Sequence, residues 1–201
     1  MCTKLRRKRM QLGVTLVELV VFIVIVSVAL AGVLKVLEVV NRGSADPLIR
    51  KQALAIAESL LQEIEQQPFT FCDPDDANAA TAISAADCTD SQDKGGVALT
   101  STSPAGESRY SATNPLDNVA DYGGFAMPGD GCAGICSPGD TTPLAGLEAY
   151  AASVTITRAG ALAPFADLAE DAVLKITVRV TGPANTEVNL TGYRVRYAPN
   201  I

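Results

Sequence analysis

The feature that most constrains this chain is a long apolar run near its start, residues 13–40, GVTLVELVVFIVIVSVALAGVLKVLEVV. Between Val14 and Leu34 the only polar side chains are those of Thr15, Glu18 and Ser27. As a helix rising about 1.5 Å per residue, this stretch spans roughly 30 Å, which is the hydrocarbon thickness of a bilayer. The sequence therefore predicts a membrane helix.

Glu18 is unusual in such a helix, because an unneutralised carboxylate in hydrocarbon is costly and therefore rare. No cation lies within helical reach of it on the same segment. An acid inside a membrane span indicates a function, and its partner has to be sought outside this segment.

The residues before the apolar run, MCTKLRRKRMQLG, carry five cations, no acid and a final glycine. Lys and Arg are enriched on the cytoplasmic side of membrane helices, so Lys4 to Arg9 should stay in the cytoplasm and everything beyond Val40 should face the periplasm. An ordinary cleavable secretory signal does not fit, because its cleavage site should follow the apolar region. An uncleaved signal anchor with Glu18 at the lipid headgroups is the alternative.

The basic segment, its last residue Gly13 and the following VTLVEL resemble the leader and start of a type IV prepilin. The resemblance implies that prepilin peptidase, an inner-membrane aspartic peptidase, cleaves between Gly13 and Val14 and that the amine of Val14 is then N-methylated. Glu18 becomes the fifth residue of the mature chain, where pilins and pseudopilins place a carboxylate that pairs with the N-terminal ammonium of a neighbouring subunit. Val14 departs from the Phe or Met more usual at the first mature position.

The same resemblance implies where the protein is found and what it contacts. It would be a single-pass inner-membrane protein with its C-terminal domain in the periplasm, and it would then enter a pilus filament. Its partners would be the peptidase, an inner-membrane assembly platform and other pilin subunits, which pack through the N-terminal helix.

The charge of the chain argues against nucleic acid as a partner. The sequence has 16 basic and 22 acidic residues, and removing the five leader cations leaves 11 against 22, a formal charge of −11. Such a surface repels nucleic acid, so the basic leader is better explained by membrane orientation. The length of 201 residues suits one modest domain beside the membrane segment.

Two helical segments are predicted, a transmembrane and filament-core helix over residues 14–41 and an amphipathic continuation over 42–67. In the second, apolar residues recur at steps of three and four: Ile49, Ala53, Ile56, Ala57, Leu60 and Ile64. Because a proline removes a backbone donor and clashes with the preceding turn, we expect a kink or a short unwound piece at Arg42 to Pro47. Pro68 should end the helix.

Residues 68–147 are poor in periodic pattern and rich in Gly, Pro, Asp, Ser and Thr, which predicts a long loop region that is functional or stapled. It contains four cysteines, Cys72, Cys88, Cys132 and Cys136, and an even number in an exported domain indicates disulfides. Three pairings are open, of which proximity favours Cys72 with Cys88 and Cys132 with Cys136. A zinc site is disfavoured, because the first pair lacks the close ligand spacing and the chain has no His.

The segment DPDDAN offers oxygen atoms from Asp73, Asp75, Asp76 and Asn78. Some pseudopilins that resemble this chain bind calcium, but the segment lacks the order and the distal Glu of an EF-hand loop. An Asx-rich turn around Pro74, in which short acids accept backbone hydrogen bonds, explains the same residues more simply. We therefore expect a turn, no bound metal and no cofactor.

Residues 148–201 alternate as strands do, in the stretches 150–158, 172–181 and 190–198. The last stretch sets Tyr193, Val195 and Tyr197 on one side against Arg194 and Arg196 on the other. The short connection TGPANTE predicts an antiparallel hairpin. One apolar face of the sheet should pack on the helix stripe, which gives an α+β fold with the long helix against a small C-terminal antiparallel sheet.

Later stretches resemble a narrower group, the MshD-type minor pilins of mannose-sensitive haemagglutinin pilus systems. The resemblance lies in ADPLIRKQALAIAESLLQEI with PFTFCDPDDAN, and in VLKITVRVTGP with LTGYRVRYAPN. It implies a minor pilin that assembles into, or primes, a pilus used in adhesion or motility. The alternatives are a type II secretion pseudopilin and an adhesin or ligand-binding module anchored by a pilin stem.

An enzyme is not expected. The absence of His excludes Ser–His and Cys–His activation, and the chain has no G-x-S-x-G, no P-loop and no G-x-G-x-x-G. The acids of the soluble part are most simply a solvated surface.

Overall fold

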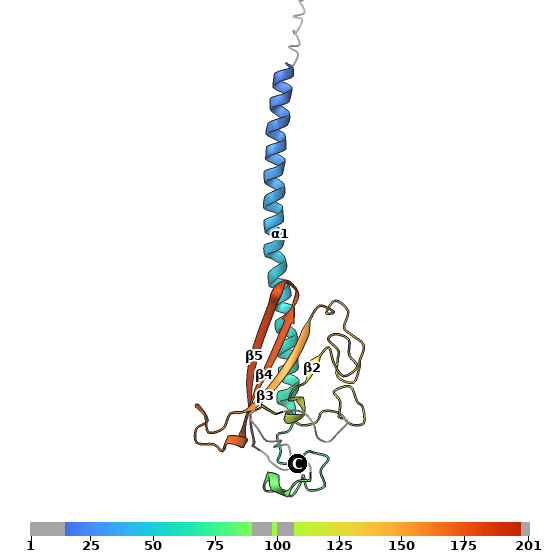
Figure 1. Ribbon diagram of the computed structural model, residues 1–201, viewed down its shortest axis with the longest axis vertical. Helices are drawn as coiled ribbons and strands as arrows, with labels where there is room; N and C mark the ends of the chain where they lie inside the picture. Colours follow the sequence, from blue (N-terminus) through green and yellow to red (C-terminus); the bar gives the residue numbers. More distant parts are fainter. Residues whose placement is uncertain (1–14, 90–97, 100–106, 198–201) are drawn as a thin grey trace, which may run out of the picture. The chain divides into compact units, whose positions relative to one another are not determined.

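The computed structural model describes residues 15–89, 98–99 and 107–197 (Figure 1). Contacts divide the chain into two units, Met1–Ala45 and Asp46–Ile201, which are described separately below. The predicted leader, residues 1–13, and Val14, the predicted first residue of the mature chain, lie outside the described residues.

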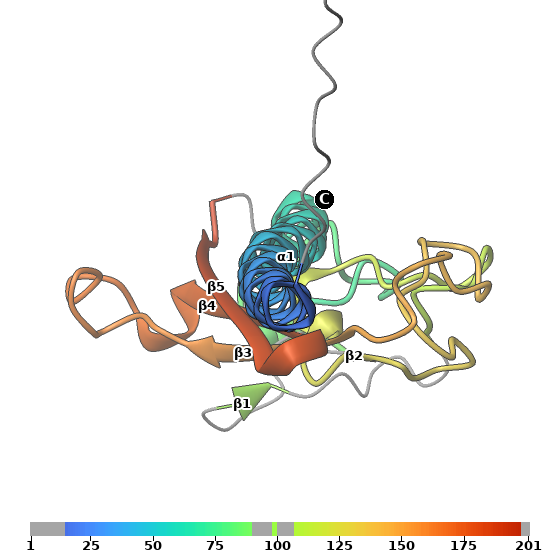
Figure 2. The ribbon, with the colours of Figure 1, turned by 90° about the horizontal axis from the view of Figure 1, so that it is seen from above.

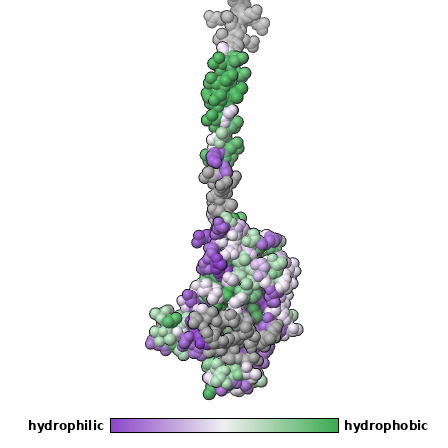
Figure 3. Space-filling view, viewed as in Figure 1, coloured by the Kyte–Doolittle hydropathy of each residue, from purple (hydrophilic) through white to green (hydrophobic). Residues whose placement is uncertain are grey.

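The first unit is the start of helix α1, which runs over Leu16–Gln66. Thr15 caps it, since the backbone N–H of Glu18 donates to Thr15 Oγ1 at 3.2 Å. Residues Leu16–Glu38 are long and apolar enough to cross a membrane. Their large apolar side chains are exposed, and Figure 3 shows them as the hydrophobic part of the helix surface.

The expected unwound piece at Arg42 to Pro47 is wrong, because α1 continues through these residues with Pro47 inside it. Proline has a backbone φ that suits a helix and removes only one donor, the one that would bond to the carbonyl four residues earlier. The hydrogen bonds on both sides of this gap keep the segment helical. The kink stays a prediction.

The second unit contains the remainder of α1, and this part has the predicted buried stripe. The side chains of Ala53, Ala57 and Ile64 are fully buried, and Leu60 is 2% exposed. The helix ends at Gln66, two residues before Pro68, as the sequence predicted.

The stripe packs in one core with an antiparallel sheet in the order β1-β3-β4-β5 (Figures 1 and 2). The long strands are β3 Ala151–Arg158, β4 Val173–Gly182 and β5 Thr186–Val195, and the short ones are β1 Ala98–Leu99 and β2 Ala126–Met127, both paired with β3. Short 3-10 turns occupy Ala85–Asp87, Val119–Tyr122, Glu170–Ala172 and Pro183–Asn185. The predicted α+β fold is confirmed.

Strands β3 and β4 alternate as predicted, with every second side chain in the core. Val154, Ile156, Ile176, Val178 and Val180 are at most 2% exposed. The hairpin between β4 and β5 is also confirmed, and its turn places Ala184 and Asn185 in the left-handed region at φ 54° and 57°.

Strand β5 differs from the prediction in its start and in its orientation. It begins at Thr186 instead of Leu190. Tyr193, Val195 and Tyr197, expected on the side that packs on the helix, are instead 46%, 38% and 93% exposed. The register with β4 explains this, because it pairs Val188 with buried Val180 and so turns the even-numbered residues inward.

The inward side of the chain therefore carries two arginines, Arg194 near the end of β5 and Arg196 just after it, and each has a partner. Arg194 Nη2 donates to the backbone oxygen of Gln67 at 3.1 Å, where α1 has ended. The guanidinium of Arg196 lies 4.5 Å from the ring centres of both Phe69 and Phe71, a cation–π arrangement. The backbone oxygen of Gln67 and the rings of Phe69 and Phe71 thus provide partners for arginine at this end of the sheet.

Candidate functional site

The predicted assembly residue Glu18 lies in the first turn of α1 and is exposed. An acid in this position is favoured by the partial positive charge of the helix start. Within the part of the chain that the structure describes, no cation pairs with its carboxylate, and Lys35 is engaged 3.2 Å from Glu38. A partner for Glu18 is therefore not found among the described residues.

The first part of α1 exposes large apolar side chains over most of its surface. Leu16, Phe22, Val28 and Leu34 are all more than half exposed, and so are most large side chains between them. Of the described residues within Leu16–Glu38, none is buried by the rest of the protein. Such a surface is suited to lipid or to other apolar helices, and not to water.

Two disulfides connect described parts of the predicted loop region, residues 68–147. Cys72 is bonded to Cys88, and Cys132 is bonded to Cys136, the two pairs that proximity in the sequence favoured. Each closes a local loop, with sequence separations of 16 and 4.

A buried arginine fixes the same loops to α1. Arg109 Nε and Nη2 donate to the two carboxylate oxygens of Glu63 at 2.6 and 2.7 Å, and Nη1 donates to the backbone oxygen of Cys136 at 2.7 Å. Tyr122 donates a further hydrogen bond to Glu63 at 2.9 Å. Burial, with the charge of Glu63, raises the pKa of Tyr122. The sequence contained no signal for this pair, since its members are 46 residues apart.

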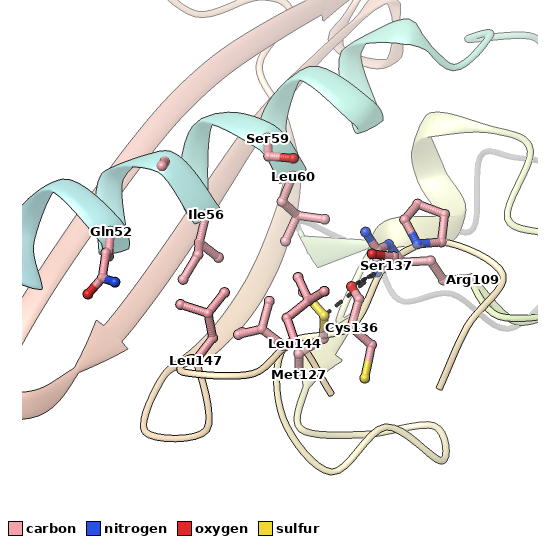
Figure 4. Close-up of a pocket in the computed structure, with 13 residues that line it drawn as sticks. Gln52, Ile56, Ser59, Leu60, Arg109, Met127, Cys136, Ser137, Leu144 and Leu147 are labelled. Carbon is pink, nitrogen blue, oxygen red and sulfur yellow. Dashed lines mark hydrogen bonds between the residues drawn. The ribbon is translucent and has the colours of Figure 1, made fainter. Parts of the chain in front are cut away.

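Arg109 also borders an apolar cavity of about 290 Å³ beside α1 (Figure 4). Ile56 and Leu60 from α1 face Leu144 and Leu147 from the loop across it. The guanidinium is engaged with Glu63, Cys136 and Met127, so what the cavity presents is mainly apolar surface.

Four acids from distant parts of the sequence meet at one point of the loop region. Ligand oxygens of Asp73, Glu107, Asp117 and Asp121 all lie within 4.8 Å of one another, and we call these residues the four-acid cluster. Asp73 and Asp121 are each only 1% exposed. Asp121 Oδ2 also accepts hydrogen bonds from the backbone N–H groups of Asp117 and Asn118, which positions the cluster at the start of the turn Val119–Tyr122.

Burial is the largest cause that raises the pKa of Asp117 to about 6, and the charges of Asp73 and Asp75 add to it. The cluster therefore takes up a proton more readily than separate carboxylates would. Carboxylate oxygens at this spacing are also the ligands that a hard cation such as Ca²⁺ takes in proteins. Among the described residues, this is the group of acids that could hold one.

The predicted Asx turn is present in DPDDAN. The N–H of Asp75 donates to Asp73 Oδ1 at 2.9 Å, and the N–H of Asn78 donates to Asp76 Oδ1 at 2.8 Å. Of the four residues that offer side-chain oxygens in that segment, only Asp73 belongs to the four-acid cluster. Sequence reasoning missed the other three members because Glu107, and the neighbouring Asp117 and Asp121, lie far from Asp73 in the sequence.

Comparisons with known proteins bear on the N-terminal part of the chain. A model of the prokaryotic N-terminal methylation motif matches residues 8–34, a stretch that contains Gly13, Val14 and Glu18. Searches of curated proteins and of solved structures found no match. This motif implies processing by prepilin peptidase and assembly with other pilins, which are structural proteins. The motif and the α+β architecture together support the assignment of this chain as a type IV pilin-like protein.

Proposed function

We propose that this chain is a minor pilin of the MshD type, which enters or primes a type IV pilus used in adhesion or motility. Prepilin peptidase cleaves it between Gly13 and Val14, the new amine is methylated, and the mature chain waits in the inner membrane with its second unit in the periplasm. An assembly platform then moves it into the filament. The observation that carries this proposal is the methylation motif over residues 8–34, with an acid at Glu18.

The structure of α1 supports the assembly step by its chemistry. The helix exposes apolar side chains on all sides over Leu16–Glu38, and the one acid near its start is Glu18. An ammonium and a carboxylate that meet in lipid relieve each other's desolvation, whereas either alone is costly. Pairing of Glu18 with the amine of Val14 in a neighbouring subunit therefore fixes the axial offset between the two apolar helices.

The narrower assignment to a minor pilin rests on the resemblance of the later stretches to MshD-type proteins and on the size of the second unit. Part of the second unit consists of the long sheet strands and the buried stripe of α1, and the loops that contain the two disulfides make up the rest. A type II secretion pseudopilin would share the same motif. A minor pilin and a pseudopilin differ in the assembly to which they belong, a pilus or a secretion system.

Filaments sheared from cells test this proposal directly. The mature chain should co-purify with them at a small fraction of the amount of the major subunit, and cross-linking with mass spectrometry should join its α1 to that subunit. Deletion of its gene should reduce piliation and leave protein secretion unchanged. Loss of secretion with intact pili would assign the chain to a pseudopilus and overturn the pilus proposal.

A further inference from the structure

The outer face of the sheet, turned away from α1, carries an aromatic side chain and a cation that the core does not use. Tyr193 is 46% exposed and Lys175 is exposed. The two are cross-strand partners, and Lys175 is also paired with Thr157. Because neighbouring strands lie about 4.8 Å apart, Thr157, Lys175 and Tyr193 form a row of roughly 10 Å across β3, β4 and β5.

The loop between β3 and β4 makes a wall at one end of this row (Figure 1, orange). Two backbone hydrogen bonds join the two sides of this loop. The N–H of Ala161 donates to the oxygen of Leu168 at 2.9 Å, and the N–H of Gly160 donates to the oxygen of Glu170 at 3.2 Å. The ring of Phe165 in this loop is 5.2 Å from that of Tyr193, at an interplanar angle of 53°. The row and the wall enclose a cavity of about 330 Å³.

The size of this cavity is at the lower end of the range for ligand pockets, about 300–1,000 Å³. Its lining combines three kinds of group: the rings of Phe165 and Tyr193, the hydroxyl of Thr157 and the cation of Lys175, and Arg158 borders it at the end of β3. Arg158 lies 4.0 Å from Glu170. No carboxylate among the described residues forms an ion pair with Lys175, although the mature chain has twice as many acids as bases. The cavity therefore presents positive charge on a strongly acidic protein.

We propose that this cavity binds a uronic-acid residue of an acidic polysaccharide. The sugar ring packs its C–H face on Tyr193 and Phe165, its carboxylate pairs with Lys175, and one of its hydroxyls bonds to Thr157. A flat ring that carries hydroxyls and one carboxylate matches the aromatic wall and the polar row together, whereas an acidic peptide would use only the cation. This binding goes beyond filament assembly and does not depend on it.

The test uses the mature full-length protein in detergent, with trigalacturonic acid as the probe and saturation-transfer NMR as the readout. The neutral trisaccharide maltotriose is the matched ligand control. We expect saturation transfer to trigalacturonic acid, a much weaker signal with maltotriose, and a loss of affinity as salt is raised. Equal signals from the two sugars, or none from trigalacturonic acid, would show that the cavity does not recognise a uronic acid.

Variants separate this site from general charge attraction. Lys175→Gln should weaken binding about tenfold by removing a charge-assisted contact, and Tyr193→Thr, which suits an exposed strand, should weaken it similarly. Lys51→Gln removes one exposed cation from α1 and should leave binding unchanged. Unfolding curves for all three variants should match that of the wild type. Wild-type binding by Lys175→Gln, or complete displacement of the sugar by an oligoglutamate peptide, would contradict the proposal.

Discussion

Buried Arg109 and partly buried Glu63 form a two-point ion pair that joins the loop region to α1 across 46 residues of sequence. Arg109 also holds the backbone of Cys136, so a single guanidinium connects the helix and the second disulfide loop. Tyr122 adds a third attachment to Glu63. The loops are thus positioned by polar contacts with α1 as well as by the hydrophobic core.

Removal of one partner of this pair should be strongly destabilising, because the other charge is left buried. We expect Arg109→Met to lower the free energy of unfolding by about 3 kcal/mol. The double variant Arg109→Met with Glu63→Met should recover part of that loss. Glu58→Gln, on the exposed side of the same helix, is the control and should change stability by less than about 0.5 kcal/mol. Urea unfolding of the detergent-solubilised protein compares these three variants with the wild type. Wild-type stability of Arg109→Met would mean that the pair is not a structural anchor.

The four-acid cluster predicts an unusual dependence of stability on pH. The pKa of Asp117 is about 6 in the folded protein, above its ordinary value of 3.8, so the folded state holds the proton more tightly. The free energy of unfolding should therefore fall as pH rises from about 4 to 6, as far as this group contributes. Asp117→Asn should remove that fall and raise the melting temperature at neutral pH.

Asp140 is the matched control for this experiment. It is exposed, and the backbone N–H of Thr142 lowers its pKa, so its small contribution has the opposite sign and is lost as pH falls. Melting curves across this pH range, with and without added Ca²⁺, compare Asp117→Asn and Asp140→Asn with the wild type. If the melting temperature of Asp117→Asn depended on pH as that of the wild type does, the ionised carboxylate of Asp117 would not lower stability.

The orientation of β5 can be tested with two valines. Val188 is 9% exposed and faces the core, whereas Val195 is 38% exposed on the other face. Val188→Ala should cost about 2 kcal/mol of stability, and Val195→Ala less than about 0.5 kcal/mol. Urea unfolding measures both variants. A larger loss of stability in Val195→Ala than in Val188→Ala would support the orientation that the sequence alone suggested.

Processing is expected to depend on the small residue before the helix. Gly13→Leu should block cleavage, because a bulky side chain hinders access of the peptidase to the scissile bond. Mass spectrometry of membrane extracts should show the mature chain starting at methylated Val14 in the wild type and the intact leader in the variant. An intact leader with Cys2 in the wild type would exclude the prepilin mechanism.

Glu18 should be needed for assembly and dispensable for folding. Glu18→Gln and Glu18→Val should give a processed, membrane-resident protein that enters filaments poorly, since the proposed partner amine belongs to another subunit. Quantitative immunoblots of sheared filaments and of membranes provide the readout. If Glu18→Val reached filaments at the wild-type ratio, pairing with a neighbouring amine would have no role in assembly.

Local patterns in the sequence determined the long elements of this fold, but not the short strands β1 and β2, which lie in the region predicted as loop. The apolar run predicted the membrane part of α1, the three- and four-residue recurrence of Ala53, Ala57 and Leu60 predicted its buried stripe, and alternation predicted β3 and β4. Each of these signals comes from residues close in sequence, whose geometry is fixed by the helix or strand period. The same holds for the two disulfides, whose cysteines are near neighbours along the chain.

Only the tertiary structure decided which face of β5 is buried and which distant polar groups meet. The alternation of Tyr193 and Val195 with Arg194 identifies two faces but does not say which one turns inward. Pairing with β4 decides it, and Gly192 then lies where any Cβ would overlap the carboxylate of Glu65 and approach Leu61 Cδ1 to 3.1 Å. The ion pair of Arg109 and the four-acid cluster were equally hidden, because contacts between separate loops leave no period in the sequence.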